Sequence, residues 1–310
     1  MSEDPKYFST SEEACWVNCR LAHKFQYDLG YAPAVTNSKL SLGIIYHLGF
    51  EAIYLEKTDA EVQAVVDEGI AERREELEAS AGPKGVPGDM AMEFVKDSAL
   101  VKEMVAGYRP WAKEAGVDVG YETVSVEEPL TVQFPGTDVV FRGKLDLLQR
   151  HTSTGQLRVV DAKTRATFFK DTLPYQLSEQ NGNYQLAVMA TYGERPTEMV
   201  YREARKMAPI CNPRSKGPYY QEIRVRLTAE EMAYRAEQYA QNANEATDPN
   251  RRIYANPGGC CGSWKNDWSG PCQKVHMGVD PLTAVAEDPG YAPKDPDERY
   301  NELDRKAEAK

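Results

Sequence analysis

The chain has 310 residues, of which 41% are hydrophobic, so it can bury a full core in one large domain or two. Its net charge of −11 argues against a protein that coats nucleic acid nonspecifically. No run of 18 apolar residues exists, and residues 1–6 lack the apolar core of a signal peptide, which argues against a membrane protein. We therefore expect a cytoplasmic protein whose six cysteines are metal ligands or buried thiols rather than disulfides.

Helix and strand patterns are unevenly distributed along the chain. Capping and turn signals predict helices over 9–29, 39–56, 59–80 and about 90–115. Further on, they predict strands over 121–128, 130–134, 138–150 and 156–164, a helix over 175–192, strands near 197–205 and 219–227, and a helix from 229 to about 246. This order predicts an α/β fold with a mixed central sheet flanked by helices and an N-terminal helical elaboration.

We expect one domain over residues 1–276. Within it, 8–115 is mostly helical, 120–250 forms the catalytic core and 251–276 is a cysteine-containing segment. From residue 277 the sequence is acidic, punctuated by proline and poor in large apolar residues. The segment 277–310 is therefore predicted to be a disordered or loosely docked tail.

The segment 139–164 is the most informative part of the sequence, because it predicts a hairpin with a carboxylate on each strand. Both flanks are rich in β-branched and apolar residues, and a turn sequence separates them. A turn centred at 153–154 places Asp146 opposite Asp161, with Cβ atoms about 5 Å apart. Lys163 follows Asp161 by two residues and therefore shares its sheet face.

Two facing carboxylates repel each other, so a positive group is expected between them, and a divalent cation is the economical choice. Such an ion can lower the pKa of a bound water, while Lys163 can orient that water or neutralise developing charge. The arrangement suits hydrolysis of a phosphodiester. The alternative is a surface hairpin with an ordinary Asp/Lys pair, because short charged triplets are common on solvated strands.

Two predicted helices add polar residues at helical spacing. Gly43 and His47 are four apart, so the small Gly43 lets another backbone approach the face that carries His47. Gln180 and Tyr184 are also four apart and supply donors suited to a phosphate backbone. The alternatives are a core histidine and a polar stripe on a half-buried helix.

A basic stretch with interleaved tyrosines covers residues 201–226 and includes Arg202, Arg205 and Lys206. Cations for phosphates and aromatic rings for bases suit a strand of DNA. A solvated loop between two strands is the alternative.

Together these motifs resemble the PD-(D/E)xK nuclease superfamily in its RecB-like branch, and more narrowly the Cas4-family exonucleases common in phages. The resemblance covers about residues 8–275 and implies a restriction-endonuclease-like core. It rests on four motifs in order: Gly43-x-x-x-His47, Gly143-x-Leu145-Asp146-Leu147-Leu148, Asp161-Ala162-Lys163 and Gln180-x-x-x-Tyr184.

In that family a histidine and two acids bind Mg²⁺ or Mn²⁺, a lysine assists catalysis, and a Gln/Tyr helix contacts DNA. The resemblance therefore implies catalysis by Lys163 with the two acids and DNA contacts from Gln180 and Tyr184. The implied metal ligands are His47, Asp146, Asp161 and the carbonyl of Ala162. An imidazole ligand tilts the preference toward Mn²⁺.

Cas4-like relatives often hold a [4Fe–4S] cluster with one N-terminal and three C-terminal cysteines. The implied ligands here are Cys19 (or Cys15), Cys260, Cys261 and Cys272. The spacing departs from the family pattern, because Cys260 and Cys261 are adjacent. Zn²⁺ at these cysteines, or cysteines without metal, are the alternatives. We also expect Cys272 and Cys261 to pack near Cys15 and Cys19.

The resemblance implies a metal-dependent DNA exonuclease that acts on single-stranded ends in recombination, repair or replication, with a recombination or replication protein as a candidate partner. One alternative is a noncatalytic DNA-binding or assembly subunit that keeps the nuclease fold. Another is an endonuclease subunit that a partner must target. Intact Asp146, Asp161 and Lys163 favour the enzyme, because a binding module does not need two facing acids.

Overall fold

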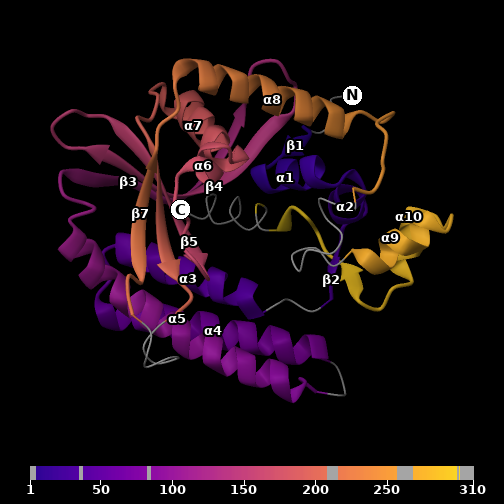
Figure 1. Ribbon diagram of the computed structural model, residues 1–310, viewed down its shortest axis with the longest axis horizontal. Helices are drawn as coiled ribbons and strands as arrows, with labels where there is room; N and C mark the ends of the chain where they lie inside the picture. The colour runs from indigo at the N-terminus through magenta and orange to yellow at the C-terminus, as the bar shows by residue number, and fades with distance from the viewer. Residues whose placement is uncertain are drawn as a thin grey trace.

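The computed structural model describes residues 5–34, 38–81, 85–207, 216–256, 268–298 and 300. It confirms the predicted α/β fold, in which a mixed sheet is flanked by helices on both faces (Figure 1). No helix in these ranges is long and apolar enough to cross a membrane.

The central sheet is built around an antiparallel meander of three strands, followed by a crossover. Its order is β1-β4-β5-β6-β7, and β3 pairs along β4. β5 and β6 are parallel and are joined through α6 and α7, whereas β7 returns antiparallel to β6. The strands are β1 (Tyr7–Phe8), β3 (Tyr121–Gln133), β4 (Val140–His151), β5 (Leu157–Arg165), β6 (Met199–Arg205) and β7 (Tyr220–Val225).

The strand β3 is continuous, where the sequence predicted two strands that break at Pro129. Pro129 lies opposite Lys144 of β4 within the unbroken pairing from Glu128 to Gln133, and the register shifts only further back, between Thr123 and Ser125. β3 pairs with β4 alone among the described strands, so it is an edge strand. A proline is tolerated there because its missing N–H can face away from the ladder.

Two layers of helices cover the sheet (Figure 1). α3, α4 and α5 pack on one face, against Leu147, Val160 and Val200. α1, α7 and α8 cover the other face, where Leu148, Val159 and Tyr201 are buried. The bounds are α1 (Thr10–Asn18), α3 (Ser38–Tyr54), α4 (Asp59–Ala81), α5 (Gly88–Ala115), α6 (Leu173–Gln176), α7 (Glu179–Tyr192) and α8 (Ala229–Thr247).

The predicted helix over 9–29 is broken at Cys19, which has an extended backbone and ends α1. It continues as α2 (Arg20–His23) and a π-helical turn, η1 (Lys24–Asp28). The break has an identifiable cause. The N–H of Leu21 donates to the carbonyl of Tyr254 at 3.1 Å, so a segment from far along the chain takes a hydrogen bond that a continuous helix would keep.

Part of the segment 277–310, which was predicted to be a disordered or loosely docked tail, forms regular elements that follow a short helix before it. α9 (Ser269–His276) is followed by α10 (Pro281–Ala286), and β8 (Tyr291–Pro293) pairs antiparallel with β2 (Tyr31–Pro33). The tail has few large apolar residues, but a small one anchors it. Val285 is fully buried in a cluster that contains Phe25 and Trp268. Residues 299 and 301–310 of the tail lie outside the described residues.

Candidate active site

The β4–β5 hairpin has the predicted register. Leu147 pairs with Val160, so the next positions along the strands are Asp146 and Asp161. The backbone ladder ends at that point, and the carboxylate of Asp146 accepts a hydrogen bond from the N–H of Ala162 at 2.8 Å. The side chain of Asp146 thus replaces a backbone acceptor where the two strands begin to separate.

Asp161 is held between a cation and an amide. Lys163 Nζ lies 2.7 Å from its Oδ2, and Gln180 Nε2 donates to its Oδ1 at 2.7 Å. Asp161 is only 2% exposed, whereas the Lys163 side chain is 28% exposed. Lys163 therefore neutralises a buried carboxylate while its ammonium stays accessible to solvent.

The two acids have pKa values shifted in opposite directions. Burial raises the pKa of Asp161 to about 6; Lys163 opposes this shift and the neighbouring Asp146 adds to it. Burial also acts to raise the pKa of Asp146, but His47, Lys163 and the N–H of Ala162 together outweigh it and bring this pKa to about 2. A buried pair of this kind favours an added positive charge between the carboxylates.

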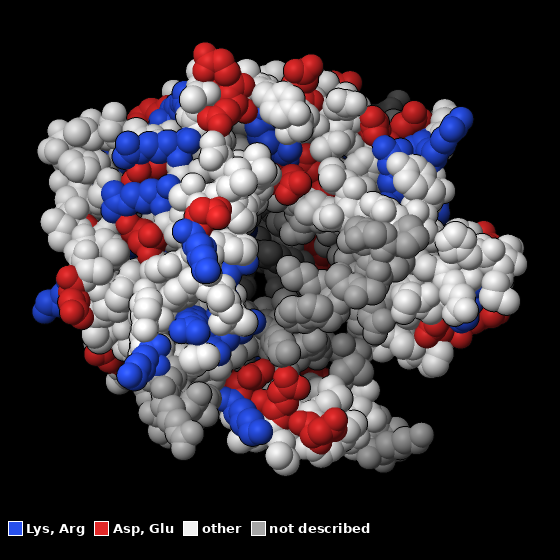
Figure 2. All heavy atoms as spheres, viewed as in Figure 1, with Lys and Arg blue, Asp and Glu red and all other residues white. Residues whose placement is uncertain are grey.

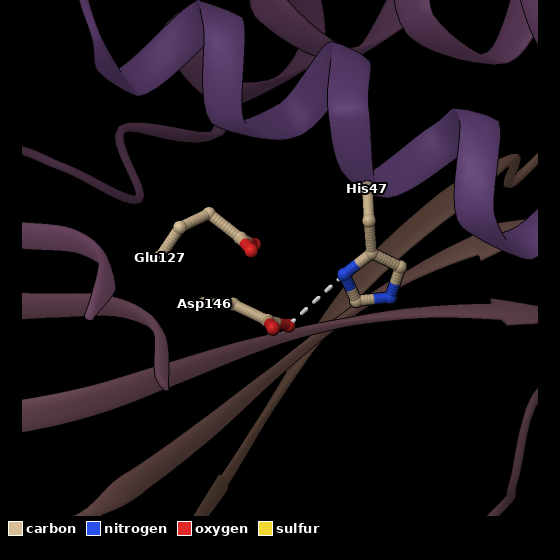
Figure 3. Close-up of side chains that lie close together, drawn as sticks. All are labelled: His47, Glu127 and Asp146. Carbon is tan, nitrogen blue, oxygen red and sulfur yellow. Dashed lines mark ion pairs between the residues drawn. The ribbon is translucent and has the colours of Figure 1, made fainter. Parts of the chain in front are cut away.

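His47 reaches the acids from α3 (Figure 3), with Nδ1 3.3 Å from Asp146 Oδ2. Its side chain is 33% exposed, which argues against a core histidine. A Cβ at Gly43 would lie 3.7 Å from Thr164 Oγ1, so α3 packs directly on β5 at that turn. A Cβ would make only an ordinary van der Waals contact there, so the packing of α3 on β5, rather than the glycine itself, brings His47 over the hairpin.

Glu127 is a site residue that sequence reasoning missed. Donor atoms of His47, Glu127 and Asp146 all lie within 4.8 Å of one another (Figure 3). Glu127 is on β3, and the register that pairs Val126 with Leu147 and Glu128 with Leu145 places it opposite Asp146. Its φ of 53° is uncommon for a residue other than glycine.

A register count across the β3–β4 hairpin would have identified Glu127. The register was not counted as far as Glu127, because the sequence predicted that the strand ends before Pro129. Glu127 also forms an ion pair with Lys144, which partly neutralises it.

The donor set of one imidazole and two carboxylates suits Mg²⁺ or Mn²⁺, since carboxylates and imidazoles are ligands of such ions. On the adjacent strand β5, Asp161 lies opposite Asp146, and Ala162, whose carbonyl is a candidate ligand, is the next residue.

Two of the residues predicted to contact DNA, Arg202 and Tyr184, are buried in the structure. Arg202 is 0% exposed and lies on the α5 side of the sheet, with Nη2 2.8 Å from Asp118 and Nε 3.2 Å from Glu222. Tyr184 is buried against Gly143 and Phe141. Arg202 balances buried charge, and Tyr184 fixes α7 to β4.

Gln180, Arg205 and Lys206 remain near solvent. All three are half-buried, and Arg205 lies beside Arg165 across the β5–β6 pairing. The face drawn in Figure 2 has a hollow at its centre, and Lys and Arg side chains gather on the side of it where Figure 1 shows β7. Local positive charge therefore exists on this face despite the net charge of −11.

The predicted approach of the cysteines is confirmed for the described ones. Cys19 and Cys272 are buried in one apolar cluster, and Cys15 packs against it. Burial, with Cys19 nearby, raises the pKa of Cys15 to about 12. Cys260 and Cys261 lie outside the described residues, as does Cys211.

A mixed sheet between two helical layers, with acids and a lysine on adjacent strands, defines the restriction-endonuclease-like class of fold. The chain belongs to the PD-(D/E)XK nuclease superfamily, whose family model matches residues 7–264. Members of this superfamily are nucleases that use divalent metal ions, and the donors around Asp146 fit that requirement.

Two solved structures are distantly similar to the chain. One is a crystal structure described as a "Putative exonuclease" from Eubacterium rectale, with 14% identity and a TM-score of 0.46, covering 78% of this chain and 80% of that one. The other is the crystal structure of SSO0001, with 10% identity and a TM-score of 0.30, covering 78% of this chain and 77% of that one. No curated protein matches the sequence.

Proposed function

We propose that the protein is a metal-dependent DNA exonuclease that hydrolyses phosphodiester bonds at single-stranded ends, in recombination, repair or replication. One observation carries this proposal. Lys163 Nζ lies 2.7 Å from the buried carboxylate of Asp161, while Asp146 and His47 meet beside it at 3.3 Å. Superfamily membership supports a nucleic-acid substrate.

The metal ligands in this proposal are His47, Asp146, Asp161 and the carbonyl of Ala162, and the structure adds Glu127 to them. When bound, Mg²⁺ or Mn²⁺ supplies a water of lowered pKa and stabilises charge on the phosphoryl oxygens. The imidazole of His47 tilts the preference toward Mn²⁺. The raised pKa of Asp161 means that metal binding near pH 6 releases a proton from it.

Lys163 is the catalytic residue of the proposal. Its ammonium is anchored by Asp161 and partly exposed, so it can orient the attacking water or neutralise charge that develops on the phosphate. Gln180 holds the other oxygen of Asp161 and lies at the start of α7, where it can also reach the DNA backbone. Arg205 and Lys206, at the end of β6, supply further positive charge for phosphates.

The test uses end-labelled linear and circular single-stranded DNA, with and without Mn²⁺. We expect Mn²⁺-dependent shortening of the linear strand and no cutting of the circle. Asp161→Asn should be inactive, and Asp138→Asn, an exposed acid near the β3–β4 turn, should behave as wild type. Cutting of the circle would identify an endonuclease. DNA binding without cleavage under any metal would favour the noncatalytic subunit.

An iron–sulfur cluster is a separate part of the proposal. It is supported by the burial of Cys19 and Cys272 in the same apolar cluster of side chains. Cys260 and Cys261 would be the other two ligands of the iron–sulfur cluster. Protein purified without oxygen should then be brown and contain iron. Colourless, iron-free protein would remove the cluster and leave the nuclease proposal unchanged.

A further inference from the structure

Arg165 is the last residue of β5 and lies on the same strand as Asp161 and Lys163. Alternate residues of a strand point to the same face, so all three side chains share one face of the sheet. Two residues of strand separate Arg165 from Lys163, which is about 6.6–7 Å. A cation at that distance from the catalytic lysine lies about one nucleotide further along an extended DNA strand.

The guanidinium of Arg165 is fixed by its surroundings. Its Nε donates to Glu203 Oε1 at 2.7 Å and to the hydroxyl of Tyr175 at 2.9 Å. Glu203 is 1% exposed and also accepts hydrogen bonds from Tyr175 and Gln221. The ring of Phe169 lies 4.1 Å from the guanidinium carbon. A side chain held on this many sides loses little conformational freedom when it binds a ligand.

The two terminal nitrogens of Arg165 remain available. Both hydrogen bonds come from Nε, and no side chain in the described ranges accepts one from either Nη. The side chain is 28% exposed, so these nitrogens can meet solvent or a ligand. The rigid fork of an arginine matches the oxygens of a phosphate, and such charge-assisted bonds are strong.

A purely structural role for Arg165 would be to neutralise the buried Glu203. That role alone would be served best by the fork, with two parallel bonds to the carboxylate. The structure instead uses Nε for Glu203 and leaves the fork on the face of Asp161 and Lys163. Arg205, across from Arg165 in the β5–β6 register, adds positive charge beside it.

We propose that Arg165 binds the phosphodiester next to the one that is cleaved, and so sets the position of the strand in the site. This inference rests on the proposed function, since it names a subsite for the same DNA strand. Arg165 does not touch the reacting atoms and is a binding residue.

The test measures DNA affinity in an Asp161→Asn background, where cleavage is stopped. Short single strands each carry one neutral methylphosphonate at a successive position, and their binding is followed by fluorescence anisotropy. With Arg165 present, one position should weaken binding about tenfold. With Arg165→Gln, binding of the unmodified strand should fall about tenfold and that methylphosphonate should have no further effect, because the two changes remove the same contact.

Two further variants guard against misfolding. Arg165→Gln leaves Glu203 buried without its cation, so Arg165→Gln/Glu203→Gln should fold well and give the same methylphosphonate profile. Lys102→Gln is the matched control, because the Lys102 side chain is 44% exposed and pairs with Asp67 between α4 and α5, outside the basic stretch 201–226. It should keep the wild-type profile.

Identical methylphosphonate profiles with and without Arg165 would overturn this proposal alone. Failure of the Asp161→Asn protein to bind DNA at all would overturn it together with the proposed function.

Discussion

The carboxylate of Asp146 accepts a hydrogen bond from the backbone N–H of Ala162 at 2.8 Å, just beyond the last backbone pair of β4 and β5. The same carboxylate lies 3.3 Å from His47 on α3. The Asp146 side chain therefore links the two strands at the open end of the hairpin and contacts α3. It is also a candidate metal ligand.

We predict that Asp146→Ala lowers the free energy of unfolding of the metal-free protein by about 1–3 kcal/mol at pH 7, because it leaves a buried N–H without its acceptor. Asp146→Asn keeps an acceptor and should recover part of this loss. Urea unfolding measures both. An alanine variant as stable as wild type would show that the Asp146–Ala162 bond does not hold the hairpin.

Asp161 should affect stability in the opposite direction. Its pKa of about 6 lies above the ordinary value of 3.8, so between these values the folded protein holds a proton that the unfolded chain has lost. Its contribution to stability is therefore present below about pH 4 and lost as pH rises to about 6. Metal-free Asp161→Asn should be more stable than wild type at pH 8 by about 1–3 kcal/mol, and similar to it at pH 4. Thermal unfolding at the two pH values checks this; a variant destabilised equally at both would contradict it.

Glu127→Gln should weaken Mn²⁺ binding about tenfold without unfolding the protein, because it removes one carboxylate from the donor cluster. Glu122→Gln, on the exposed part of the same strand, is the matched control. Calorimetric titration with Mn²⁺ separates the two. Unchanged affinity in Glu127→Gln would restrict Glu127 to its ion pair with Lys144.

Substitutions of the basic residues in and after β6 should affect DNA binding differently, according to whether the residue is buried. Arg202→Met should leave the salt dependence of DNA binding unchanged while altering stability, because Arg202 is buried among Asp118, Glu222 and two tyrosines. Arg205→Gln/Lys206→Gln should reduce affinity and flatten the salt dependence, because fewer counterions are released. Anisotropy titrations over a range of salt concentrations measure both. A flattened slope for Arg202→Met would restore its role in DNA binding.

The β4–β5 hairpin was predictable because its register depends on a short local turn. A count from residues 153–154 placed Asp146 opposite Asp161, and the structure has that register. Local alternation also placed Lys163 on the face of Asp161. Both inferences need only the geometry of one hairpin.

The rest of the site depends on contacts between distant segments. Arg202 looked like a surface cation in a basic stretch, but β6 lies between β5 and β7 under α5. Asp118 and Tyr108, which lie 84 and 94 residues earlier in the chain, make its burial tolerable. Glu127 was hidden because a proline reads as a strand break, and only the edge position of β3 makes Pro129 acceptable.

The central claim is that Lys163 acts beside a metal held by the neighbouring acids. The most direct test compares wild type with Lys163→Met for single-turnover, Mn²⁺-dependent cleavage of end-labelled single-stranded DNA, with Mn²⁺ and DNA affinities measured on the same preparations. We predict at least about a 100-fold loss of cleavage rate, with both affinities within a few-fold of wild type. A Lys163→Met protein that cleaves at the wild-type rate would contradict the assignment of this site.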